Sequence, residues 1–159
     1  MVSIIKGAAA AAAAAGATFV LKTSDESVTS STSVQDDDQL TFTMAADKIY
    51  AISGALLIDS GTTPDFKWSL NLAGSSTADL LSKYLSPGGS SAVYRFSEND
   101  DNSTMGYGAG TPGMTAEFTG IIKADGSGGA LTLQWAQNTS NGTASKLLTG
   151  SWISYTLLN

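Results

Sequence analysis

Regular alternation of apolar and polar residues is the clearest pattern in this chain, and it is sharpest near the end. Across residues 131–136 every second side chain is Leu or Trp, and a similar pattern returns at 152–158. A period of two places one row of side chains on a buried face, as in a half-buried β-strand. The Asn141-Gly142 pair between the two segments favours the positive φ of a primed turn. The sequence therefore predicts a β-hairpin over residues 130–159.

The same alternation recurs earlier in the chain, in segments separated by turn residues. Strands are predicted at residues 39–44, 48–58, 65–72, 92–96 and 114–124, and residues 18–21 are either a first short strand or the end of an arm. Residues 125–129 (DGSGG) are predicted to be a hairpin connection. About eight strands at spacings of roughly 8–15 residues are typical of a sandwich or barrel. We therefore expect an all-β, antiparallel fold.

Three positions inside these segments carry more specific expectations. Gly54 interrupts a long apolar strand, which indicates a bulge or a close approach of another backbone. Trp68 shares its row with Phe66, so it is expected in the core rather than as a platform for a ligand. Residues 77–85 depart from a period of two, because their Leu and Tyr side chains fall on one side of a helical turn. A short helix is predicted there, although a strand would also accommodate these residues.

Two stretches lack the alternation and are predicted to be loops. Residues 22–35 are rich in Ser and Thr, which favours an extended loop. Residues 97–113 form a longer one, and loops of that length are frequently functional. Tyr107 is the single aromatic residue in it and lies between two glycines. We interpret Tyr107 either as an exposed contact residue or as an aromatic packed beneath its own loop.

The first 17 residues differ in composition from everything after them, with eight consecutive alanines at 8–15. Alanine favours helix, but an isolated helix needs about 12–15 residues even when it is Ala-rich. Lys6 followed by alanines also fits a weak signal peptide. A membrane span would need about 20 strongly apolar residues, so no membrane partner is expected. A flexible arm, an arm that docks on a partner and a signal peptide all stay open.

Charge and composition exclude several classes of function. The net charge is −6 and no run of basic residues exists, so nucleic acid is not an expected partner. The chain has no Cys and no His, which removes thiolate chemistry and the commonest general base and metal ligand. We therefore assign no catalytic or cofactor-binding residue, and we do not expect an enzyme.

The run Asp36-Asp37-Asp38 is the only sharp acidic cluster. A calcium loop needs its ligands at alternate positions, with a Gly and a closing Glu, and these are missing here. Three aspartates before a strand more often mark a solvated turn that discourages pairing at a sheet edge. We expect a solvated turn and assign no metal site.

Several phrases resemble a recurrent domain of tailed bacteriophages. They are SVQDDDQLTF at 33–42, KIYAISG at 48–54, LIDSGTTPDF at 57–66, LTLQWAQNTSNG at 131–142 and GSW at 150–152. This resemblance covers about residues 20–157 and is to jelly-roll capsid decoration (cement) proteins and head or tail fibre domains. Trp68 and the segment 80–85 fit the family pattern less well.

The resemblance implies a jelly-roll β-sandwich at residues 22–159 and an N-terminal arm, extended or partly helical, at residues 1–21. Its function would be that of a structural virion protein on the outer capsid surface, a homotrimer that binds the major capsid protein. No cofactor is implied. The expected partner contacts are Ile4, Ile5, Phe19, Val20 and Tyr107.

Two alternatives remain open at this stage. A phage fibre domain that binds a receptor or glycan would use Tyr107 and its loop. A secreted enzyme or adhesin domain would require cleavage of the first 17 residues.

Overall fold

The computed structural model describes residues 16–61, 63–85, 91–98, 105–107 and 113–159, with the backbone alone in 91–98 and 105–107. Within these ranges the chain is all-β, as the sequence predicts, and contains twelve strands. They are β1 (Thr18–Leu21), β2 (Glu26–Val28), β3 (Gln35–Met44), β4 (Ile49–Ser60), β5 (Phe66–Leu72), β6 (Thr77–Leu85), β7 (Ser91–Glu98), β8 (Met105–Tyr107), β9 (Met114–Lys123), β10 (Gly129–Ala136), β11 (Ser145–Leu147) and β12 (Trp152–Leu157).

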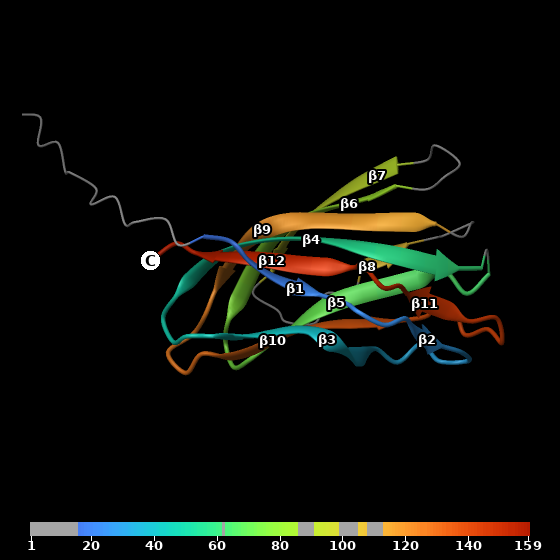
Figure 1. The fold of residues 1–159 in the computed structure, drawn as a ribbon, viewed down its shortest axis with the longest axis horizontal. Helices are drawn as coiled ribbons and strands as arrows, with labels where there is room; N and C mark the ends of the chain where they lie inside the picture. The colour runs from blue at the N-terminus through green and yellow to red at the C-terminus, as the bar shows by residue number, and fades with distance from the viewer. Residues whose placement is uncertain (1–15, 62, 86–90, 99–104, 108–112) are drawn as a thin grey trace, which may run out of the picture.

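The strands form two antiparallel sheets that stack as a β-sandwich (Figure 1). The larger, eight-stranded sheet has the order β1-β12-β4-β9-β6-β7, with β11 and β2 continuing from β4. The smaller sheet has the order β3-β10-β5-β8. This confirms the predicted β-sandwich. Three of the strands beyond the expected eight, β2, β8 and β11, are only three residues long and fall in stretches without alternation.

The inward rows of both sheets supply one core, and its largest side chains are aromatic. Trp68 and Trp135 are register partners on β5 and β10, and both are fully buried, which confirms the core role predicted for Trp68. Trp68 packs on Phe118 of the opposite sheet, and Phe66 stacks on Trp135. Neither indole N–H has a hydrogen-bond partner among the described residues, which costs about 1–3 kcal/mol each. Apolar burial in the core must offset that cost.

The predicted hairpin at residues 130–159 is wrong. β10 lies in the small sheet, whereas β12 lies in the large sheet between β1 and β4, so the chain crosses the sandwich between them. Gln137 is buried and holds this crossing, because its Oε1 accepts the Asn141 N–H at 3.0 Å and its Nε2 donates to the Thr143 carbonyl at 2.7 Å. The primed turn predicted at Asn141-Gly142 is also wrong, because neither residue has a positive φ.

The hairpin connection predicted at residues 125–129 is wrong for the same reason. β9 pairs with β4 and β6 in the large sheet, and β10 pairs with β3 and β5 in the small one. The segment between them is a second crossing from one layer to the other.

The predicted helix at residues 77–85 is also wrong, because this segment is strand β6. Ala78, Leu80 and Ser82 face inward, and the side chains between them face outward. β6 is hydrogen-bonded along its whole length to β9 on one side and to β7 on the other. Pairing on both edges outweighs the weak helical pattern of so short a segment.

The acidic cluster does not form a solvated turn, since all three aspartates lie inside β3. The pairing of β3 with β10 shifts in register here, and Asp37 points inward while its neighbours stay exposed. The Oδ1 of Asp37 accepts the backbone N–H groups of Gln39 at 3.0 Å and Leu40 at 2.7 Å. Its Oδ2 accepts Lys22 Nζ at 2.6 Å, and both side chains are almost completely buried. The cluster therefore supplies an internal ion pair.

Asp125 ties together three turns at one end of the sandwich. Its Oδ1 accepts the N–H groups of Ser127 and Gly128, its Oδ2 accepts that of Ser75, and its carbonyl accepts that of Asp47. The backbone donors of Ser75 and Ser127 lower the pKa of the Asp125 carboxyl below its ordinary value of 3.8. The carboxylate form thus stabilises this end.

We expect Gly54→Ala to lower the free energy of unfolding by about 1–3 kcal/mol. A Cβ at Gly54 would meet the ring of Phe118 and lie 2.8 Å from the Trp152 carbonyl, which supports the close approach inferred from the sequence. Gly142→Ala is the control, because a Cβ there meets nothing within 4 Å. Urea unfolding measures both, and equal stabilities would contradict the packing assigned to Gly54.

We expect Asp125→Asn to destabilise the protein at neutral pH and to match the wild type in acid. A folded-state pKa below the unfolded one gives stability that is fully present above the unfolded value and is lost as the pH falls through the folded value. Thermal melts between pH 7 and pH 2 would show the two curves converging below pH 3.8. Asp38→Asn, at an exposed position of β3, is the control and should melt at the temperature of the wild type at pH 7.

Candidate contact surface

The described part of the chain offers little for small-molecule or metal chemistry. No group of three or more His, Cys, Asp or Glu side chains within it is arranged to hold a metal ion. No helix among the same residues is long and apolar enough to cross a membrane. Pockets and exposed apolar surface are the remaining candidate features.

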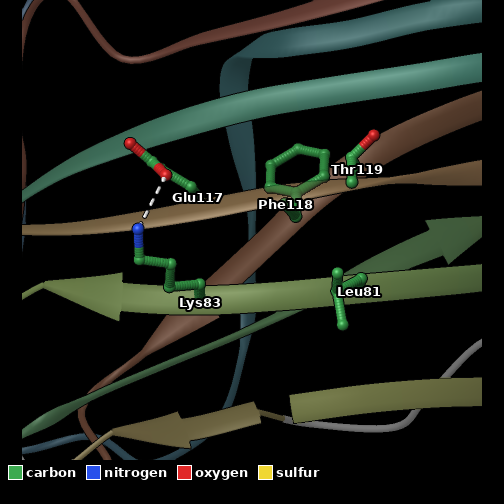
Figure 2. Close-up of a pocket in the computed structure, with 5 residues that line it drawn as sticks. All are labelled: Leu81, Lys83, Glu117, Phe118 and Thr119. Carbon is green, nitrogen blue, oxygen red and sulfur yellow. Dashed lines mark ion pairs between the residues drawn. The ribbon is translucent and has the colours of Figure 1, made fainter. Parts of the chain in front are cut away.

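A pocket of about 210 Å³ lies over β6 and β9 and is lined by Leu81, Lys83, Glu117, Phe118 and Thr119 (Figure 2). Lys83 and Glu117 are register partners, and their charged atoms lie 3.9 Å apart with both side chains about half exposed. Such a surface pair contributes about 0–1 kcal/mol. Ligand pockets usually measure about 300–1,000 Å³, so this one is too small for a typical metabolite.

The more distinctive surface lies at the β1 edge, which we define as Phe19, Leu21 and Trp152. β1 is the last strand of the large sheet and pairs only with β12 among the described strands. Phe19 is 65% exposed and Leu21 is 56% exposed. The Phe19 ring lies 5.6 Å from that of Trp152, which is the register partner of Leu21. Three large apolar side chains thus gather on the outer face beside an open strand edge.

Alternation along β1 separates this surface from the core. Val20 lies between the two exposed residues and packs inward against the hydrophobic core, opposite the fully buried Ile153. The chain then continues into Lys22, whose N–H donates to the Ser151 carbonyl at 2.8 Å and whose carbonyl accepts the Gly150 N–H at 2.9 Å. These bonds extend the β1–β12 ladder and fix the direction of β1.

Charged groups at the end of β1 hold it in position. Burial lowers the pKa of Lys22, but hydrogen bonds to Asp37 and Glu26 outweigh that effect and raise the pKa above its ordinary value. Burial raises the pKa of the Glu26 carboxyl, although its hydrogen bond with Lys22 acts in the opposite direction. Lys22 is consequently held as an ammonium ion between two carboxyl groups.

Two of the five contact residues predicted from the sequence lie on this edge strand. Phe19 is exposed there, while Val20 contributes more to packing than to the surface. Ile4 and Ile5 lie outside the described residues. Tyr107 belongs to β8, at the edge of the small sheet remote from β3, and its backbone pairs with that of Phe66. Since β1 lies beside β3, Tyr107 is at the opposite edge of the sandwich from Phe19.

Sequence reasoning missed Leu21 and Trp152. Leu21 follows Phe19 by two residues, so a period of two already assigns both to one face. Trp152 belongs to a strand more than a hundred residues later, and only the β1–β12 pairing brings it to Leu21. The exposure of Leu21 beside Phe19 could therefore be predicted from the sequence, whereas the position of Trp152 could not.

No protein-family model and no curated protein sequence matches this chain. Among solved structures, the structure of infectious bursal disease virus, Gt strain, is 8% identical with a TM-score of 0.22, over 90% of this chain and 40% of the matched one. The crystal structure of the infectious bursal disease virus VP2 subviral particle is 10% identical with the same TM-score, over 91% and 41%. The chain thus spans about two fifths of these proteins. Similarity at this TM-score carries no argument about function.

We expect Leu21→Ser to change the free energy of unfolding by about 0.5 kcal/mol or less, because the side chain is mostly in solvent already. Val20→Ser should cost about 1–3 kcal/mol, since it removes core packing and places a hydroxyl there. Urea unfolding of the two variants compares neighbouring residues on opposite faces of one strand. A larger loss for Leu21→Ser would show that this residue serves the fold rather than a contact.

Proposed function

We propose that this chain is a structural protein of a virus particle, a decoration (cement) protein that binds the outer surface of a tailed-phage head. In this proposal it acts as a homotrimer, contacts the major capsid protein and catalyses no reaction. The family resemblance of residues 20–157 suggests the role. The observation that carries the proposal is the β1 edge, where exposed apolar side chains adjoin a strand that has no partner on its outer side among the described strands.

An open strand edge and an apolar patch favour protein partners for separate reasons. The free backbone groups of an edge strand can pair with another chain, and proteins usually blunt such edges with charge or cover them. β1 carries Phe19 and Leu21 in its outward positions and no charged residue. Contact with a partner would remove this apolar surface from water and satisfy the backbone groups together.

The position of β1 in the chain connects the β1 edge to the proposed arm. β1 begins at Thr18, directly after residues 1–17, so a partner that binds the β1 edge is also within reach of that segment. In the proposal, Ile4 and Ile5 add apolar contacts to the partner next to those of Phe19. An arm ordered on binding loses about 1–2 kcal/mol of conformational entropy per residue, so it needs extensive contact to stay attached.

The test compares four proteins: the full chain, a chain lacking residues 1–17, the variant F19S/L21S, and the control L81S/L85S. The control removes exposed leucines from β6, far from β1 in the sheet order. Light scattering measures the mass in solution, and co-sedimentation measures binding to undecorated phage heads. We expect the full chain and the control to be trimers that sediment with heads.

The truncated chain should remain a trimer and bind heads at least tenfold more weakly. F19S/L21S should lose head binding too. If all four proteins bind alike, the β1 edge is not the contact and the proposal is wrong. If the full chain ignores heads and binds host cells, a receptor-binding fibre domain replaces the decoration protein.

A further inference from the structure

A buried cluster of one amine and two carboxyl groups joins the segment from β1 to β2 in the large sheet to β3 in the small sheet. Lys22 follows β1 and Glu26 begins β2, while Asp37 lies on β3 of the other sheet. The side chains of Lys22 and Asp37 are 1% and 0% exposed, and that of Glu26 is 21% exposed. The contact surface proposed above uses none of these three side chains.

The geometry brings a nucleophile against an electrophile. Lys22 Nζ lies 2.6 Å from Asp37 Oδ2, so the nitrogen is adjacent to the carboxyl carbon. Backbone hydrogen bonds with Ser151 and Gly150 fix the main chain of Lys22, and Glu26 Oε2 accepts a hydrogen bond from its amine at 2.9 Å. The pairing of β3 with β10 fixes Asp37 from the other side. Reacting groups held in this way have effective concentrations of about 10⁵–10⁸ M.

The other carboxylate oxygen of Asp37, Oδ1, accepts hydrogen bonds from two backbone N–H groups. Its Oδ1 accepts the backbone N–H groups of Leu40 at 2.7 Å and Gln39 at 3.0 Å. If the amine adds to the carboxyl carbon, negative charge develops on this oxygen, and fixed N–H groups stabilise such charge. These two donors therefore have the arrangement of an oxyanion hole.

Glu26 is placed to carry protons during the reaction. Its Oε2 accepts Lys22 Nζ at 2.9 Å, and its Oε1 accepts Gln35 Nε2 at 2.8 Å, which fixes its orientation. Burial raises the pKa of this carboxyl, so its carboxylate is a better proton acceptor than one in water.

We propose that Lys22 and Asp37 condense spontaneously to an intramolecular amide (isopeptide) bond, with Glu26 as the proton shuttle. A proton first passes from the Lys22 ammonium to Asp37 Oδ2, which leaves a neutral amine and a carboxylic acid. The nitrogen lone pair then attacks the carboxyl carbon, and the electrons of the C=O bond move to Oδ1.

Glu26 next removes a proton from the nitrogen and passes it to the Oδ2 hydroxyl. The bond from carbon to Oδ2 breaks, one water molecule leaves, and the carbonyl to Oδ1 forms again. Glu26 ends as the carboxylate with which it began. The products are one amide and one water, so no oxidant, reductant or activating co-substrate is required.

Burial favours both the reaction and the persistence of its product. The hydrogen bonds that raise the pKa of Lys22 favour its ammonium form, so the neutral amine and acid are a minor species from which the reaction proceeds. Burial makes this species more accessible than it is in water, because separate charges lose their hydration in a dry site. Water excluded from the pair also cannot hydrolyse the amide. The bond would join the large sheet to the small sheet and close a ring through residues 22–37.

Mass spectrometry of the denatured full chain tests the proposal. The cross-linked protein should be lighter than its sequence by one water. Lys22 is the only Lys or Arg between residues 7 and 47, and trypsin does not cleave after an acylated lysine. A digest should therefore contain a single peptide of residues 7–48 lacking one water, in place of peptides 7–22 and 23–48.

Two variants and one control assign the roles. Lys22→Met should have its full mass. If Lys22→Met fails to fold, Glu26→Gln still tests the chemistry, because Gln keeps a hydrogen-bond acceptor for Lys22 but cannot accept a proton. We expect Glu26→Gln to fold, as measured by circular dichroism. It should form the cross-link at least about 100-fold more slowly than the wild type. Asp38→Asn, the exposed neighbour, should cross-link like the wild type.

Full mass and normal cleavage after Lys22 in the folded wild-type protein would overturn the proposal. Loss of water with cleavage after Lys22 intact would also overturn it, since the dehydration would then lie elsewhere. An unchanged rate in Glu26→Gln would overturn the role of Glu26.

Discussion

The contact between Lys22 and Asp37 is the interaction on which the arrangement of the two sheets at one edge depends. Each side chain is buried, so neither charge is tolerable without the other, and removing one partner of such a pair costs about 3–5 kcal/mol. The same carboxylate satisfies the backbone N–H groups that the register shift of β3 leaves free. The continuation of β1 into β2 and the irregular start of β3 are therefore parts of one structure. The pairing also explains why β1 can remain ordered as an edge strand of only four residues.

Most strands were predictable from the sequence, because burial on one face imposes a period of two that can be counted directly. Which strands pair was not predictable, since a polar connection such as residues 138–143 can lead to a strand of either sheet. The segment 77–85 was misassigned because a nine-residue strand with leucines on both faces also fits a helix. Asp37 was misassigned because a charged residue reads as exposed unless its partner is known, and Lys22 lies fifteen residues away. Of the contact surface, Phe19 was predictable from its own segment, whereas Trp152 required the fold.

The apolar residues of this chain fall into two sets, one that packs the core and one that lies on the outer face. Aromatic side chains from both sheets fill the interior, with Trp68 against Phe118 and Phe42 stacked on Tyr155. The outer face of the large sheet keeps a second, smaller set in solvent, which the fold does not need. Exposed apolar side chains that gather in one patch, as Phe19, Leu21 and Trp152 do, are those expected to serve a partner. The proposed attachment role rests on this division, while the reaction proposed for Lys22 concerns the interior alone.

The direction of β1 determines how the protein would respond to mechanical force. β1 runs antiparallel to β12 and enters the sheet at Thr18, so tension applied through the preceding residues acts along the strand axis. In that geometry the hydrogen bonds of the ladder are sheared together instead of being opened one after another. The extended ladder ends at Lys22, so any load that the ladder transmits arrives at the contact of Lys22 with Asp37 on the other sheet. A pull along β1 thereby reaches both sheets through the Lys22–Asp37 contact.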